Sequence, residues 1–131
     1  MRLYLDTAPV IYAIERVPLY AAAIDKRLSD AGIVLVASDL TRMECRVMPL
    51  RNGNADLLKD YDDYFREAVD EIVILSREVI DCATDIRAKY RFKTPDAIHL
   101  AAAVMSGCDA FLTNDRRLDR FKDIAIEIIQ P

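Results

Sequence analysis

The chain has 131 residues, of which 53% are hydrophobic and 31% charged, and its formal net charge is −4. This composition predicts one globular domain, residues 1–131, and the net acidity argues against a protein that coats nucleic acid non-specifically. An acid at position 6 interrupts any signal-peptide core, and no apolar run approaches the ~20 residues that span a bilayer. We therefore expect a cytoplasmic protein that does not enter the membrane, with its three widely spaced cysteines reduced.

Short apolar runs alternate with helical patterns from the start of the chain. Thr7 is a candidate N-cap, and Pro9 would lie in the first turn of its helix, where a missing N–H costs little. The elements expected in this half are a strand at 2–5, a helix from Thr7, a helix from Pro18 to Gly32, and a strand at 33–37. A helix capped by Ser38 or Asp39 then follows and is predicted to stop near Pro49.

The same alternation continues to the end. The remaining expected elements are a helix at 55–68, a strand at 72–75, a helix through 79–86, a helix from Thr94 to Gly107, and strands at 110–113 and 124–129. Apolar strands separated by helices predict an α/β fold with a mostly parallel sheet of about five strands, covered on both faces. Ligands of such sheets bind beyond the carboxyl ends of the strands.

Four carboxylates are predicted near that edge. Asp6 directly follows the first strand, and Asp115 follows the strand at 110–113. Asp96 opens a helix behind Thr94-Pro95, and Glu44 lies early in the helix after 33–37. Hard cations such as Mg²⁺ prefer oxygen ligands, so convergence of these acids would indicate a metal-dependent phosphodiesterase.

Each acid also has a plainer interpretation as a solvated cap or turn residue. Asp96 could favour the positive end of a helix dipole, and Asp115 could be an N-cap. Glu44 is the most informative, because its neighbours at helical spacing are apolar and predict a position on or beside the buried side: Leu40, Met43 and Val47. A buried acid needs a partner, and a metal ion is one.

Several polar residues adjoin these acids. The only histidine, His99, lies one helical turn after Asp96, and without a His/Cys cluster we expect it to pack or to support a ligand rather than bind zinc. Thr113 and Asn114 could orient Asp115, and Asp119 is a possible fifth acid. Two basic runs flank the acidic positions and would suit a phosphate substrate: Arg87, Lys89, Arg91 and Lys93, and Arg116, Arg117, Arg120 and Lys122.

Four segments resemble the motifs of PIN-domain ribonucleases, in order and across the whole chain. They are Leu5-Asp6-Thr7, Leu40-Thr41-Arg42-Met43-Glu44, Thr94-Pro95-Asp96-Ala97-Ile98-His99-Leu100-Ala101, and Leu112-Thr113-Asn114-Asp115-Arg116. The chain is most similar to the VapC-type toxins of toxin–antitoxin pairs. One departure is Ala8, which stands where the family often has Asn or Ser, although the Thr7 hydroxyl remains.

The resemblance implies a three-layer α/β/α sandwich whose acids, corresponding to Asp6, Glu44, Asp96 and Asp115, hold Mg²⁺ or Mn²⁺. It also implies an RNA substrate, a homodimer and a cognate antitoxin protein that covers the active site. Thr7 would support the ligands, and Arg116 and Arg42 are candidates to contact phosphate or the antitoxin's acids.

Other classes fit less well. A phosphatase of the haloacid-dehalogenase type would need an acid where Ala8 stands. A receiver domain would need an Asp directly after a central strand, but the strand at 33–37 runs into Ser38-Asp39 without an early acidic pair to match. A nucleotide-binding module is disfavoured because no Gly-rich phosphate loop is present. The remaining alternative is a non-catalytic PIN fold that acts as a binding or scaffold protein.

Overall fold

A computed structural model describes all residues, 1–131. Its sheet has five parallel strands in the order β3-β2-β1-β4-β5. The strands are β1 (Arg2–Leu5), β2 (Val34–Ser38), β3 (Glu71–Val73), β4 (Ala110–Thr113) and β5 (Ala125–Ile128). Because β1 and β4 are neighbours in the centre, their carboxyl ends lie side by side, with Leu5 in register with Leu112.

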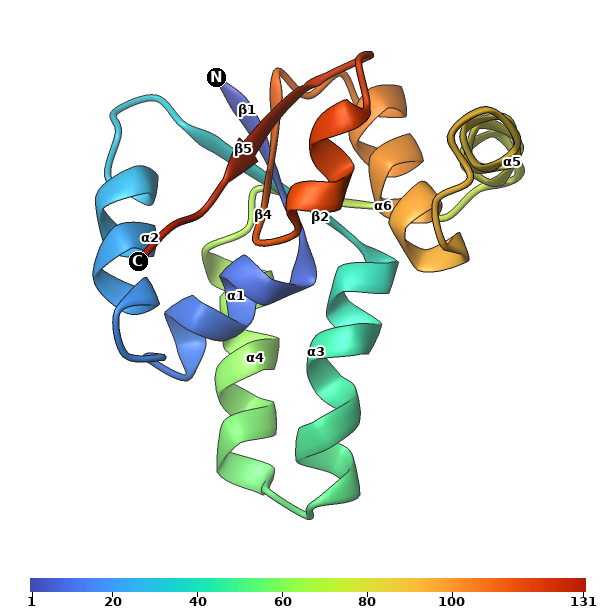
Figure 1. Ribbon diagram of the computed structural model, residues 1–131. Coiled ribbons are helices and arrows are strands. Elements are labelled where there is room, and N and C mark those ends of the chain that lie inside the picture. Colours follow the sequence, from blue (N-terminus) through green and yellow to red (C-terminus); the bar gives the residue numbers. More distant parts are fainter.

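Helices cover both faces of this sheet (Figure 1). They are α1 (Thr7–Ile14), α2 (Tyr20–Leu28), α3 (Asp39–Arg51), α4 (Ala55–Glu67), α5 (Arg77–Tyr90) and α6 (Thr94–Met105), with a 3₁₀ helix η1 (Arg116–Arg120) after β4. The α3 and α4 helices lie side by side as a hairpin (Figure 1). The predicted α/β/α sandwich around a parallel five-stranded sheet is therefore confirmed.

Alternate residues of each strand enter two hydrophobic cores. Tyr4 and Phe111 point to the face covered by α5, α6 and η1, whereas Leu3, Leu5 and Leu112 point to the face covered by α1–α4. This separation follows from the two-residue period of a strand. Both central strands are fully covered, so only their ends can meet a ligand.

Several boundaries differ from those predicted. Asp6, not Thr7, is the N-cap of α1, and this leaves the Thr7 side chain free to bond elsewhere. Ser38 caps α3 through a capping box with Thr41, and the helix continues past Pro49 to Arg51. A proline so near the helix end removes only one of the last backbone hydrogen bonds, so the helix need not stop there.

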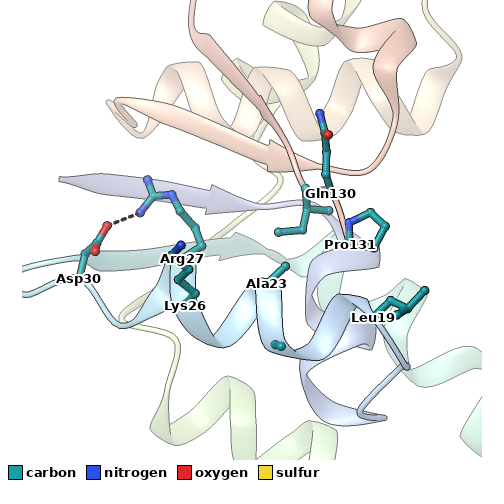
Figure 2. A pocket seen from close by; sticks show the side chains of 9 residues that line it. Leu19, Ala23, Lys26, Arg27, Asp30, Gln130 and Pro131 are labelled. Atoms are coloured by element: carbon teal, nitrogen blue, oxygen red, sulfur yellow. Dashed lines mark hydrogen bonds and ion pairs between the residues drawn. The ribbon is translucent and has the colours of Figure 1, made fainter.

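None of the six helices is both long and apolar enough to cross a membrane. A cavity of about 590 Å³ lies between α2 and the C-terminal residues (Figure 2). Its lining includes Leu19, Ile129 and the ion pair between Arg27 and Asp30 (3.0 Å), but none of the four predicted acids. The cavity thus adjoins the residues that follow β5 and shares no residue with the four predicted acids.

Leu19 permits a test of backbone strain. Its φ is +74°, which is unfavourable for a side chain with a Cβ, and the residue is 76% exposed. Because little packing is lost, we expect Leu19→Gly to raise the free energy of unfolding by up to about 1 kcal/mol in urea denaturation. Leu50→Gly is the matched control: Leu50 is also exposed but lies within α3, so that variant should lose about 0.5–1 kcal/mol. Equal losses in both variants would contradict the expectation.

Candidate active site

Asp6 is fixed at the centre of the carboxyl edge. Its Oδ1 accepts a hydrogen bond from the Thr7 backbone N–H (2.8 Å), and its Oδ2 accepts one from the Thr113 hydroxyl (2.7 Å). The Asp6 backbone N–H donates to the carbonyl of Leu112 on β4 (3.0 Å). The end of β1 and the end of β4 therefore hold this carboxylate together.

Glu44 reaches the same place from the second turn of α3. Its Oε1 accepts hydrogen bonds from the Thr7 hydroxyl (2.7 Å) and from His99 Nε2 (2.6 Å). Burial by itself would raise the pKa of Glu44, but the bonds from His99 and Thr7 outweigh it, so the pKa is lowered. Glu44 is therefore held ionised, with one oxygen saturated by protein donors.

His99 connects the acids to the core. Its side chain is 2% exposed, and its Nε2 carries a proton because the Glu44 carboxylate can only accept. Its other nitrogen, Nδ1, shares a hydrogen bond with the Tyr4 hydroxyl (2.8 Å), which also bonds Ser38 Oγ (2.8 Å). Nε2 lies 3.6 Å from Asp6 Oδ1. Burial raises the pKa of Tyr4, so this hydroxyl stays protonated.

Asp96 lies in the first turn of α6, partly buried, and its carboxylate accepts no hydrogen bond from the protein. Its pKa is raised, first by burial and then by the negative charges of Asp6 and Asp115. Like charges raise a carboxyl pKa only when they are close. Asp6, Asp96 and Asp115 therefore act on one another electrostatically and are called the acidic centre here, while the charges of Arg117 and His99 lower the pKa of Asp96 in part.

Asp115 is the N-cap of η1 and forms a two-pronged ion pair with Arg117. Arg117 donates to its carboxylate from Nε (2.9 Å), Nη2 (2.7 Å) and the backbone N–H (2.9 Å). These bonds lower the pKa of Asp115. The Asp115 N–H in turn donates to Thr113 Oγ1 (3.1 Å), so Thr113 links it to Asp6. Arg117 was not singled out from the sequence.

The other predicted residues lie away from this centre or at its margin. Asn114 donates to the Tyr12 hydroxyl (2.8 Å) rather than to an acid, and Asp119 is exposed on η1. Arg42 faces a carboxylate of α4 at 3.6 Å, and Arg116 is exposed without an ion pair. The structure thus places Arg117, and not Arg116, against the acids.

The donor set suits a hard cation, but no three His, Cys, Asp or Glu side chains are already close enough to ligate one ion. Mg²⁺ commonly uses one or two carboxylates and keeps several waters, so three preassembled side chains are not required. Asp96, which has no donor, and Asp6, whose charge raises the pKa of Asp96, supply two such carboxylates. The residues present therefore fit a hydrated divalent ion.

The fold and the site define an α/β protein with an acidic centre at the carboxyl ends of its central parallel strands. A family model described as the PIN domain matches residues 3–124. The chain therefore belongs to the PIN-domain family, as the four sequence motifs predicted. Among curated proteins, no sequence matches.

Solved structures share the fold at low sequence identity. A chain of VapBC2 from Rickettsia felis, solved with a DNA fragment from the promoter, has a TM-score of 0.80 and 16% identity, with 99% of this chain and 100% of that chain covered. DNA-bound VapBC from Salmonella typhimurium gives 0.75 and 19% identity, covering 99% of each chain. VapC20 of Mycobacterium tuberculosis, a Sarcin-Ricin loop cleaving toxin, gives 0.70 and 11%, covering 83% and 86% respectively.

Proposed function

We propose that this protein is a Mg²⁺- or Mn²⁺-dependent endoribonuclease that hydrolyses RNA phosphodiester bonds. The observation that carries the proposal is Asp96, a partly buried carboxylate without a hydrogen-bond donor, whose pKa is raised in part by Asp6 and Asp115. Carboxylates confined in this way repel one another, and a divalent cation relieves the repulsion. Membership of the PIN family and the likeness to a Sarcin-Ricin loop cleaving toxin support the assignment of substrate.

In this proposal Asp6, Asp96 and Asp115 hold the ion, and Glu44 completes the shell directly or through water. A divalent ion there would neutralise the scissile phosphate and lower the pKa of the attacking water. His99 and Thr7 occupy one Glu44 oxygen and leave the other free. Thr113 orients Asp6, and Arg117, which bonds Asp115, would supply a positive charge to a substrate phosphate.

We further propose that the protein is the toxin of a toxin–antitoxin pair and forms a homodimer. Two of the structures that share its fold are VapBC complexes, which supports an antitoxin protein as partner. Arg42 is half-exposed and Arg116 is exposed, and both remain candidates to contact that partner or the RNA backbone. Co-purification with the product of an adjacent small gene would test the pairing.

Metal binding tests the site independently of catalysis. We expect isothermal titration with Mn²⁺ to show saturable binding to the wild-type protein, together with a rise in melting temperature. An ion at a hundred times its dissociation constant stabilises the folded state by about 2.7 kcal/mol. Asp96→Asn should abolish both effects, whereas Asp60→Asn, at an exposed position on α4, should retain them. Absence of binding by the wild-type protein would favour the non-catalytic scaffold.

A further inference from the structure

A small basic pocket adjoins the acidic centre. Its volume is about 170 Å³, and it is lined by Arg91, Phe92 and Lys93 before α6, by Asp96, and by Arg117, Leu118 and Arg120 of η1. Asp96 belongs both to this pocket and to the acidic centre. A ligand that spans the two sites therefore has to pass this carboxylate.

Most of the positive charge in the pocket is not paired with a carboxylate of the protein. Of its four cationic side chains only Arg117 forms an ion pair, and its partner is Asp115. Arg91, Lys93 and Arg120 are exposed and pair with no carboxylate of the protein. These three charges are therefore available to an anionic ligand.

Arg120 is held in position by aromatic packing. Its guanidinium lies 4.1 Å from the centroid of the Phe92 ring, and Phe92 stacks on Tyr90 with centroids 5.4 Å apart. A guanidinium over a ring face keeps its N–H groups free at the edge for an anion. Phe92 itself is only 5% exposed, so it offers no surface on which a base could stack. The pocket thus favours a phosphate over a nucleobase.

Arg91 occupies a strained backbone position. It ends α5 in the left-handed region, with φ +61°, where glycine is the favoured residue. An arginine there is a cost to the fold, and its side chain lines the pocket. Strain of this kind at a functional site suggests that the side chain is retained for binding.

We propose that this pocket, hereafter the basic pocket, binds a backbone phosphate of the RNA strand next to the phosphate that is cleaved. The inference rests on the proposed ribonuclease function and assigns Arg91, Lys93 and Arg120 as contacts. Arginine matches phosphate oxygens with paired donors, and the shared Asp96 places the basic pocket beside the reacting phosphate. Binding there fixes the register of the strand without reading its sequence.

The test is the affinity of a single-stranded RNA oligonucleotide in EDTA, which prevents metal-dependent cleavage, measured by fluorescence anisotropy from about 50 to 200 mM salt. We expect Arg120→Ala and Arg91→Gly each to weaken binding about fivefold near 0.1 M salt and to reduce the salt slope by roughly 0.7. Arg77→Ala, an exposed residue at the other end of α5, should leave both quantities unchanged. Arg91→Gly should fold at least as well as the wild type, because glycine relieves the left-handed strain.

Unchanged affinity and salt slope in Arg120→Ala and Arg91→Gly would overturn the proposal. The same result is expected if the basic pocket binds an acidic protein segment and not RNA. If the wild-type protein cleaves RNA in a metal-dependent manner but these variants bind RNA normally, the ribonuclease function holds and the role of the basic pocket is wrong. Weakened RNA binding without any cleavage by the wild-type protein would support the basic pocket and count against the ribonuclease function.

Discussion

Replacing Asp96 by asparagine should lower metal-dependent RNA cleavage by about a hundredfold or more, while the metal-free variant melts at a higher temperature. Activity is lost because the carboxylate with no protein donor is the one most free to bind the ion. Stability rises because the pKa of Asp96 is raised in the folded protein, by burial and by its acidic neighbours. Above the pH at which an unfolded aspartate ionises, the charge of Asp96 therefore lowers the free energy of unfolding, and asparagine removes this penalty.

Asp60→Asn supplies the control for this pair of measurements, since Asp60 is exposed on α4. It should change neither the cleavage rate nor the melting temperature by much, as is usual for surface substitutions. An Asp96→Asn variant with full activity would remove Asp96 from the catalytic centre. A variant that is both inactive and less stable would point to a structural role instead.

His99→Ala should be the most destabilising change near the site, with a loss of about 3 kcal/mol in urea denaturation. The substitution leaves a cavity at a 2% exposed position and removes one of the two donors to Glu44. It also removes a partner of the Tyr4 hydroxyl. Groups that orient metal ligands commonly change metal affinity by about 10–100-fold, so we expect Mn²⁺ binding to weaken as well.

Tyr4→Phe separates the hydrogen bond from the packing, because the ring stays in the core and only the hydroxyl is lost. It should cost about 1–3 kcal/mol, since His99 Nδ1 and Ser38 Oγ lose their partner. Tyr20→Phe is the matched control, because the Tyr20 hydroxyl forms no side-chain hydrogen bond and should change stability by under about 0.5 kcal/mol. Equal effects of Tyr4→Phe and Tyr20→Phe would show that the Tyr4 network contributes little.

The fold could be predicted from the sequence because its central strands are continuous apolar runs that only a doubly covered parallel sheet can bury. The ends of strands depend on pairing with segments that are distant in the sequence, and they were predicted less accurately. A strand was expected at 72–75, but β3 ends at Val73, which pairs with the last residue of β2, Ser38. Ile74, one residue further, is 74% exposed. Apolar character alone did not reveal where the neighbouring strand stops.

The four acids were singled out by their positions at element ends, and the apolar neighbours of Glu44 were only a partial guide to its burial. Leu40 is buried as expected, whereas Met43 and Val47 are 56% and 40% exposed. Glu44 is instead drawn inward by Thr7 and His99, from helices far away in the sequence. No local pattern could show this contact.

The pairing of Arg117 with Asp115 was not predicted from the sequence, for a similar reason. Arg116 and Arg117 are adjacent in the sequence, and both are exposed. Asp115 is the N-cap of η1, and the tight turn of this helix brings the Arg117 side chain back onto the Asp115 carboxylate. A short 3₁₀ helix has no periodic pattern of apolar residues from which it could be predicted.

The most direct test of the central claim is the wild-type protein incubated with single-stranded RNA in isotopically labelled water, with Mg²⁺, with Mn²⁺ or with EDTA. We predict cleavage that requires the ion, and a label in the newly formed terminal phosphate, because water is the nucleophile. Cleavage that persists in EDTA, or products that end in an unlabelled cyclic phosphate from attack by the ribose hydroxyl, would contradict a metal-dependent hydrolase at Asp6, Glu44, Asp96 and Asp115.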